Sequence, residues 1–279
     1  GIRDAQESRG LGDVYKRQLN EEINIASAIK SSEGCDDIIV LDSFSTDSTV
    51  EKARALGAKV YQRQFDNFAN QRNYLLDNLE TRYRWIFFLD ADERLTPLLI
   101  EECNKVVNEN KYSACYVAPK IMFQNKWIRH ASQYPVYQVR FVKKDEMRFE
   151  SWGHGQKEGW VKRGIGKLKE PYIHYIMSRG LDEWMRKHER YAADEAEMIA
   201  RERLSFYQFW REMINGDAIS RRRAMKKIAG NCRLRPFLRF AYLYFLHLGM
   251  LDGMAGLEYC RLMFIYEKMI LNKLSQRKV

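Results

Sequence analysis

The sequence of 279 residues predicts an α/β fold with a mainly parallel sheet, followed by a helical appendage at its C-terminal end. Short apolar segments of strand length alternate with segments of helical spacing as far as Leu181, and beyond that point the pattern is helical. With 46% hydrophobic and 30% charged residues, the composition is that of a folded globular protein. The length favours a main domain over residues 19–200 and an appendage over residues 201–279.

The first helices and strands can be placed one by one. Glu21–Ser31 has helical spacing, and Asp37–Leu41 is a β-branched apolar run of the kind found in buried parallel strands. Asp47 and Ser48 can cap the next helix, which Gly57 ends. Thereafter we expect strands at 58–61, 85–89, 112–122 and 137–142, and helices at 70–79 and from Thr96 onward.

Residues 1–18 have no apolar period, and they lack the apolar central region of a signal peptide. Asp13–Gln18 also corresponds to the translation of a transposon mosaic-end adapter used in sequencing libraries. We therefore expect residues 1–18 to be a non-native assembly scar or a disordered leader, and the first strand of the sheet to be missing or replaced.

Charge is distributed unevenly along the chain. The net charge is +10, and residues 201–279 alone hold 16 Lys and Arg against 6 Asp and Glu. A basic tail on a neutral body indicates an anionic partner, such as membrane phospholipid, nucleic acid or an acidic substrate, or else a solvated surface. The five cysteines form no CxxC pair, which is typical of reduced thiols in a cytosolic protein.

Acidic residues gather where the predicted strands end or a helix begins. The clusters are Asn20-Glu21-Glu22, Asp42 with Asp47, and Asp90-Ala91-Asp92-Glu93. In open α/β sheets ligands bind at the carboxyl ends of strands, so these clusters should converge on one crevice. Massed carboxylates repel one another unless a cation or ligand donors compensate, and Asp-x-Asp after a buried strand suits a divalent metal that bridges a diphosphate. Each cluster alone is equally consistent with a turn, a helix cap or a first-turn acidic pair.

In combination, the motifs resemble family 2 glycosyltransferases. The resemblance covers roughly residues 19–191, and it is strongest to bacterial lipopolysaccharide-core glucosyltransferases. The segments that carry it are Asn20-Glu21-Glu22, Val40-Leu41-Asp42-Ser43-Phe44-Ser45-Thr46-Asp47-Ser48-Thr49, Gln71-Arg72-Asn73 and Trp85-Ile86-Phe87-Phe88-Leu89-Asp90-Ala91-Asp92-Glu93.

The resemblance implies a GT-A fold, with inverting transfer of glucose or another hexose from a UDP-sugar to a lipid-linked or lipopolysaccharide-type glycan. It implies six residues for the donor site: Asp42 on the uracil, Glu21 near the nucleoside, Gln71 and Arg72 lining the pocket, Asp90 at the ribose or a metal-bound water, and Asp92 as ligand of Mg²⁺ or Mn²⁺. In relatives an acidic residue after the metal motif serves as general base, and Glu158 is the candidate here, although it could equally be a solvated turn residue. His174 resembles a position near the diphosphate or is a core histidine, and an acceptor sugar could contact Trp127, Arg129 and His130 unless these pack in the core.

The tail is expected to bind the cytosolic face of the inner membrane. Its basic residues, from Arg221 to Arg235, precede the aromatic stretch Phe237–Met250, and no uncharged apolar run is long enough to span a bilayer. The alternative is that these helices pack as ordinary core. Other functions to be weighed are a basic membrane- or nucleic-acid-binding module with an inactive body, and a nucleotidyltransferase. No nucleic-acid-binding motif and no glycine-rich phosphate loop is visible, so we expect no nucleic-acid partner.

Overall fold

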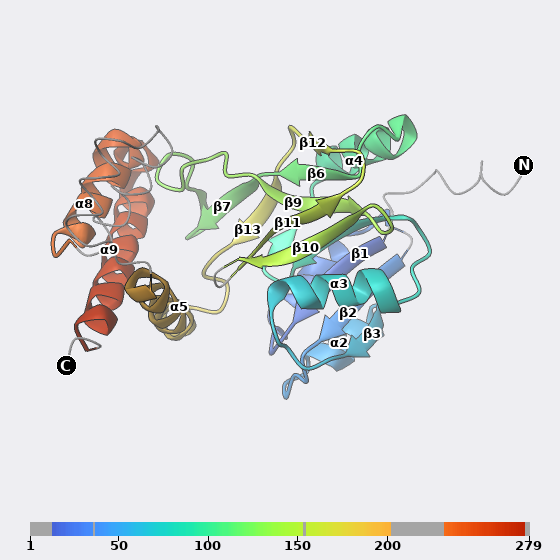
Figure 1. Cartoon of the computed structure of the whole chain (residues 1–279), viewed down its shortest axis with the longest axis horizontal. Helices are drawn as coiled ribbons and strands as arrows, with labels where there is room; N and C mark the ends of the chain where they lie inside the picture. Colours follow the sequence, from blue (N-terminus) through green and yellow to red (C-terminus); the bar gives the residue numbers. More distant parts are fainter. Residues whose placement is uncertain (1–12, 36, 153–154, 202–231, 277–279) are drawn as a thin grey trace, which may run out of the picture. The chain divides into compact units, whose positions relative to one another are not determined.

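The computed structural model describes residues 13–35, 37–152, 155–201 and 232–276, and the chain divides into two units (Figure 1). Unit 1 holds the described residues up to Trp127 and Tyr134–Arg179, and unit 2 holds Ile128–Gln133 and those from Gly180 onward. Unit 1 is α/β and unit 2 is helical, so the predicted fold class is confirmed. The division falls at residue 180 instead of the expected 200, because helix α5 (Leu181–Arg201) packs within unit 2.

The main sheet of unit 1 has seven strands. Their order is β12 (Ile165–Lys167), β6 (Ala114–Val117), β9 (Gln138–Lys143), β4 (Trp85–Asp90), β1 (Asp13–Gln18), β2 (Asp37–Asp42) and β3 (Lys59–Gln62). The strands β4, β1, β2 and β3 are parallel, while β9 is antiparallel to both of its neighbours. The parallel strands therefore place their carboxyl ends at one edge of the sheet.

The position of the first strand is filled by residues of the segment that was expected to replace the native strand. Asp13–Gln18 forms β1 between β2 and β4, with Val14 paired to Ile38 on one side and to Phe87 on the other. The side chain of Val14 is fully buried. A central strand is held mainly by backbone hydrogen bonds on both sides, which any residue other than proline can make. A segment without an apolar period can therefore fill this position.

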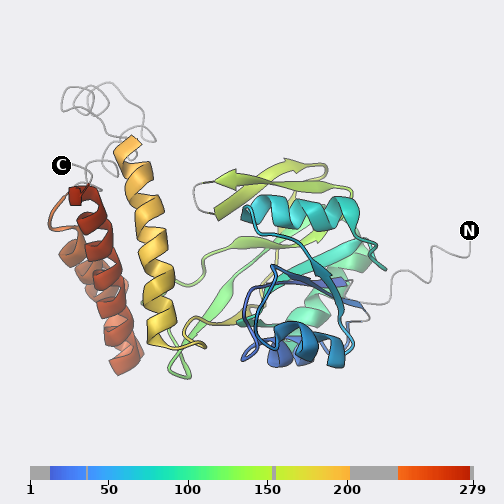
Figure 2. The same cartoon turned by 90° about the horizontal axis from the view of Figure 1, so that it is seen from below.

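Four helices flank the strands of unit 1 (Figure 2): α1 (Ile25–Lys30), α2 (Thr49–Ala55), α3 (Phe68–Asn78) and α4 (Pro97–Glu109). Strand β4 alternates between two core clusters, because successive side chains of a strand point to opposite faces. Phe87 packs in the cluster that contains Leu99 of α4, and Phe88 packs in the cluster that contains Leu75 of α3. At the start of α2, the Asp47 carboxylate accepts the backbone N–H of Thr49 at 3.0 Å.

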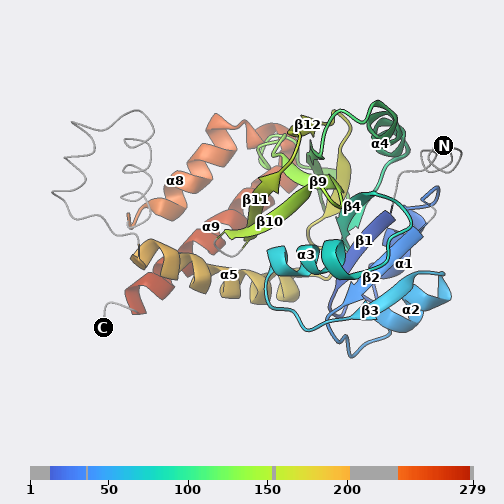
Figure 3. The ribbon, with the colours of Figure 1, turned by 45° about the vertical axis from the view of Figure 1, so that its right-hand side comes forward.

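Two smaller sheets complete unit 1. A four-stranded sheet has the order β5 (Glu93–Arg94), β13 (Tyr172–Tyr175), β7 (Pro119–Phe123) and β8 (Lys126–Trp127). The hairpin of β10 (Met147–Trp152) and β11 (Gly155–Val161) lies against α3 (Figure 3). Asn73 of α3 holds it by bonding both the N–H and the C=O of Phe149 at 2.9 Å. The single strand expected at 112–122 is divided into β6 and β7.

Unit 2 consists of α5, α8 (Arg235–Ala241), a π-helical turn η1 (Tyr242–Leu246), a 3₁₀ turn η2 (Gly249–Asp252) and α9 (Gly253–Gln276). Helices α5 and α9 run side by side (Figure 2), joined by Ala192 and Ala196 of α5 against Ile270 and Leu274 of α9. The predicted basic cluster at 221–227 lies outside the described residues. Over the described part of the chain, no helix is long and apolar enough to cross a membrane.

Candidate active site

Hydrogen bonds join the loops that follow β1 and β2. The backbone N–H groups of Asn20 and Glu21 donate to the hydroxyls of Ser45 and Thr49, each at 2.8 Å. In return, the Asn20 side chain accepts the N–H of Thr46 at 2.8 Å. Two of the predicted acidic motifs therefore form one structure at the carboxyl edge of the sheet.

Asp42 ends β2, and its carboxylate is fully buried. It accepts the N–H of Ser45 at 2.9 Å, the Ser45 hydroxyl at 2.5 Å and the side-chain amide of Gln62 at 3.1 Å. A carboxylate offers about four acceptor positions, so one is left for a further donor. Asp42 thus fixes the loop after β2, and its carboxylate has one acceptor position that no donor among the described residues fills.

Gln71 and Arg72 of α3 lie in different surroundings, although both were predicted to line the donor pocket. Gln71 is fully buried, and its amide donates to the hydroxyl of Ser43 at 3.3 Å, in the loop after β2. The guanidinium of Arg72 lies between the rings of Phe88 and Phe149, 5.0 and 5.1 Å from their centroids. Arg72 is only 7% exposed and supports the β10–β11 hairpin, and its place in the donor pocket stays a prediction.

A buried ion pair organises the acidic motif after β4. The Glu93 side chain is fully buried and pairs with Arg140 of β9 at 2.7 Å, while its other oxygen accepts the N–H of Asp90 at 2.7 Å. Arg140 also lies 3.3 Å from the Asp90 carboxylate. Burial raises the pKa of Glu93, and the charge of Arg140 acts against that rise. The pair therefore fixes the turn that presents Asp90 and Asp92.

His174 stands beside the second aspartate of the motif. Strands β13 and β5 are antiparallel neighbours with His174 opposite Glu93, and this pairing brings the His174 Nε2 to 3.3 Å from Asp92 Oδ2. Burial by itself lowers the pKa of His174, but the carboxylates of Asp92 and Glu93 together outweigh burial and raise the pKa above its ordinary value. His174 therefore lies beside the acidic motif, and its predicted place near the diphosphate stays a prediction.

Two arginines approach the same region. Arg179 lies 3.3 Å from the Glu21 carboxylate, and Arg94 donates to the backbone carbonyl of Ala91 at 2.6 Å. The pKa of Arg94 lies below its ordinary value, because burial outweighs the opposing effect of nearby groups such as Tyr175 and Asp92. No role was predicted from the sequence for Glu93, Arg94, Arg140 or Arg179. The sequence does contain an indication for Arg140, because an arginine within an apolar strand is expected to be buried and to need an acidic partner.

The residues of the motif are compatible with a divalent cation bound together with a diphosphate. Asp92 offers a carboxylate oxygen and His174 an imidazole nitrogen, and side chains of both kinds ligate Mn²⁺. Within the described ranges, no group of three or more His, Cys, Asp or Glu side chains could hold a metal by itself. A cation at Asp92 would consequently need further oxygen ligands, which water and a bound diphosphate can supply.

Glu158 lies on β11, paired across the hairpin with Phe149. It lines a cavity of about 190 Å³ together with Tyr137, Gln138, Val139, Phe149, Gln156 and Lys157. A hydrogen bond to Glu158 raises the pKa of the Tyr116 hydroxyl to about 12. Glu158 is therefore a strand residue at a cavity, not a turn residue.

The predicted acceptor contacts fall in both units. Trp127 belongs to unit 1, where its ring lies 4.8 Å from the ammonium of Lys120. Arg129 and His130 belong to unit 2, and Arg129 is exposed. The imidazole of His130 contacts the buried Asp252 carboxylate at 2.9 Å.

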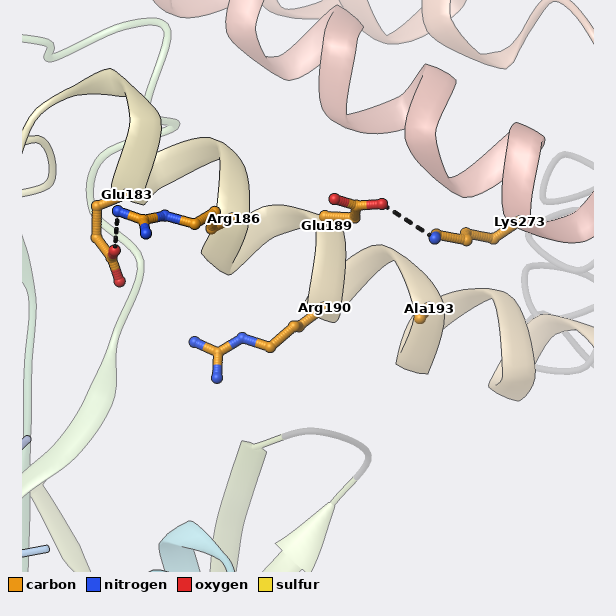
Figure 4. Close-up of a pocket in the computed structure, with 6 residues that line it drawn as sticks. All are labelled: Glu183, Arg186, Glu189, Arg190, Ala193 and Lys273. Carbon is orange, nitrogen blue, oxygen red and sulfur yellow. Dashed lines mark hydrogen bonds and ion pairs between the residues drawn. The ribbon is translucent and has the colours of Figure 1, made fainter.

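A larger cavity, of about 560 Å³, lies between α5 and α9 and contains none of the predicted site residues. Figure 4 shows its lining residues, Glu183, Arg186, Glu189, Arg190, Ala193 and Lys273. Its charges are partly paired, with Arg186 3.0 Å from Glu183 and Lys273 3.1 Å from Glu189. Size alone therefore does not identify the reactive site of this protein.

The sequence is similar to those of bacterial glycosyltransferases. It is 36% identical over 110 residues to an uncharacterized glycosyltransferase of Rickettsia felis, covering 38% of each chain. It is 32% identical over 88 residues to the lipopolysaccharide core biosynthesis glycosyltransferase LpsC of Rhizobium meliloti, covering 30% of this chain and 32% of LpsC. The matched stretch thus spans about a third of the length of these relatives.

Among solved structures, S. aureus TarS in complex with UDP-GlcNAc is similar at 13% identity and a TM-score of 0.41, over 95% of this chain and 91% of that one. The model of the family described as Glycosyl transferase family 2 matches residues 15–156. That range is half of the chain, and it contains the joined loops after β1 and β2 and the Asp90–Glu93 motif. This protein belongs to glycosyl transferase family 2, with a GT-A fold in unit 1.

Proposed function

We propose that the protein transfers a hexose, with inversion, from a UDP-sugar to a hydroxyl of a lipid-linked or lipopolysaccharide-type glycan. The observation that carries the proposal is the meeting of Asp92 and His174 at the ends of β4 and β13, beside the buried Glu93–Arg140 pair. The similarity to LpsC supports a lipopolysaccharide-type acceptor.

The donor nucleoside would bind at the joined loops after β1 and β2. Asp42 would accept the N–H of the uracil at its remaining acceptor position, and Glu21 would lie near the nucleoside. Because Asp42 is already held by Ser45 and Gln62, its oxygens are oriented before the ligand arrives. Such preorganisation lowers the entropy cost of binding.

Mg²⁺ or Mn²⁺ would be held by Asp92 and His174, with Asp90 nearby. A cation there supplies charge neutralisation of the leaving diphosphate. The protein itself would position these ligands through a fixed turn. In this turn the Glu93 carboxylate accepts the Asp90 N–H at 2.7 Å, and Arg140 compensates the negative charge of the buried Glu93.

Glu158 would accept the proton of the attacking hydroxyl. Inversion requires one general base, and Glu158 lines a cavity large enough for a few non-hydrogen atoms of an acceptor. The hydrogen bond with the Tyr116 hydroxyl would hold the carboxylate in one orientation.

The proposal is tested by release of nucleoside diphosphate across a panel of UDP-, GDP- and dTDP-sugars, with Mn²⁺ or Mg²⁺ and with a lipopolysaccharide-core acceptor. We expect turnover with a UDP-sugar, abolished in Asp92→Ala without loss of thermal stability, because Asp92 contributes charge to the site and not packing to the core. A variant that keeps near-normal activity with Mn²⁺ would remove the metal role of Asp92.

The role of Glu158 is tested separately. Glu158→Gln should bind the donor normally and lose transfer at least about a hundredfold, because the amide cannot take the proton. The matched control is Glu101→Gln, on the exposed side of α4, which should behave as wild type. If Glu158→Gln transfers within a few-fold of wild type, the base lies elsewhere.

The lipid-linked acceptor places the enzyme at a membrane. We propose a peripheral position on the cytosolic face of the inner membrane, with an anionic lipid surface as partner and no role for nucleic acid.

A further inference from the structure

Exposed apolar side chains are concentrated in one segment of unit 2. Of the twenty large hydrophobic residues that are exposed in the described chain, ten fall within residues 234–254. They are Leu234, Phe237, Leu238, Tyr242, Phe245, Leu246, Leu248, Met250, Leu251 and Met254. We call this set the apolar face. Scattered exposed apolar residues are ordinary on protein surfaces, but a contiguous set of this size marks an interaction site.

The helical geometry puts four of these side chains on one side. Leu234, Leu238, Tyr242 and Leu246 follow one another at intervals of four residues through α8 and η1. The opposite side packs on unit 2, where Pro236 and Leu243 are buried. Figure 3 shows α8 beside α9. The segment therefore has one packed side and one open side.

The charges of this segment indicate what covers the apolar face. Between residues 233 and 254 there are three arginines and one acidic residue, Asp252, which is buried against His130. Arg235 is bound inside the unit by Glu195, at 2.8 Å, and by Glu267, whereas Arg233 is exposed. A second copy of the same face would bring like charges together, which disfavours self-association. An anionic lipid surface complements both the charge and the apolar side chains.

We propose that the apolar face inserts into the headgroup region of an anionic bilayer, with Phe245 and Leu246, 57% and 77% exposed, as its deepest contacts. The insertion rests on the membrane location proposed above and assigns it to particular residues. Burial of apolar side chains contributes most of the binding free energy, because two of the arginines, Arg235 and Arg239, already form ion pairs with Glu267 or Glu195 inside unit 2. Binding through this face should consequently persist in part at high salt, where a purely electrostatic attachment is lost.

The test is vesicle flotation of the whole chain at low and high salt, with phosphatidylglycerol-containing and with neutral vesicles. We expect stronger binding to the anionic vesicles, partial retention at high salt, and a loss of about tenfold or more in Phe245→Ser/Leu246→Ser. The matched control is Leu98→Ser, an equally exposed leucine of α4, which should float as wild type.

Two further measurements separate the possible outcomes. Thermal unfolding and UDP release with a soluble acceptor should be unchanged in Phe245→Ser/Leu246→Ser, so a failed glycosyltransferase assay in every variant would count against the proposed activity and not against the membrane surface. The proposal is overturned if the double variant floats as well as wild type. It is equally overturned if wild type stays unbound to vesicles but forms a concentration-dependent dimer that the double variant cannot form, since the face would then meet a second copy.

Discussion

Replacing Arg140 with methionine removes the partner of a buried carboxylate. Glu93 is fully buried and Arg140 is only 4% exposed, with 2.7 Å between their charged atoms. Methionine fills most of the volume of the arginine stem but offers no positive charge. In Arg140→Met, Glu93 must either stay ionised without compensation or take up a proton.

Breaking a buried ion pair on one side costs about 3–5 kcal/mol of unfolding free energy. We expect Arg140→Met to lose that amount at pH 7, measured by urea unfolding followed through tryptophan fluorescence. Because Arg140 also lies 3.3 Å from Asp90, release of nucleoside diphosphate should fall together with stability.

The stability deficit of Arg140→Met should depend on pH. Burial raises the pKa of Glu93 in the folded protein, and loss of Arg140 should raise that pKa further. A carboxyl whose folded-state pKa is raised favours the fold at low pH and loses that contribution as the pH rises through the folded-state pKa. The deficit of Arg140→Met should therefore shrink between pH 7 and pH 5.

A second substitution checks this reasoning. Adding Glu93→Gln to Arg140→Met removes the uncompensated charge while keeping an oxygen for the Asp90 N–H, so the double variant should be more stable than Arg140→Met alone. A loss below about 1 kcal/mol in Arg140→Met, or no recovery in the double variant, would refute the assignment of Arg140 as the partner of Glu93.

Two further predictions follow from other buried carboxylates. Asp42→Ala should weaken UDP binding by about 1.5–3 kcal/mol, the worth of a hydrogen bond to a charged group, and unchanged affinity by calorimetry would contradict its role. Burial alone would raise the pKa of Glu146, but hydrogen bonds from Arg163, Ser113 and Lys143 lower it to about 2. Because the pKa of Glu146 is lowered in the folded protein, its ionised carboxylate stabilises the fold above about pH 4.5, and this contribution is lost as the pH falls toward 2. Glu146→Gln should therefore be about 2–3 kcal/mol less stable than wild type at pH 7 and close to wild type near pH 2. Equal deficits at both pH values in urea unfolding would exclude this explanation.

Local sequence patterns predicted the strands that need a continuous apolar run. Asp37–Leu41 and Trp85–Leu89 correspond to β2 and β4 within one residue, because burial on both faces demands apolar side chains at every position. The placement of Asp42 and Asp90 at strand ends followed from the same pattern. The hairpin β10–β11 was not predicted, since only one of its sides is buried, through Met147 and Phe149 packed with α3, and polar residues interrupt its apolar positions.

The sequence by itself determined the fold class, the family and the carboxylates at the strand ends, because these depend on short-range periodicity and on motifs contiguous in the chain. Only the tertiary structure decided that Asp13–Gln18 completes the sheet, and that Arg140 neutralises Glu93 from 47 residues away. Only the tertiary structure also showed that the neighbours Arg72 and Gln71 have different surroundings: Arg72 packs between two phenylalanine rings, and Gln71 contacts the loop after β2. The physical reason is common to all three: partners brought together by strand order and helix docking are distant or unpatterned in sequence, so their pairing becomes visible only when the chain is folded.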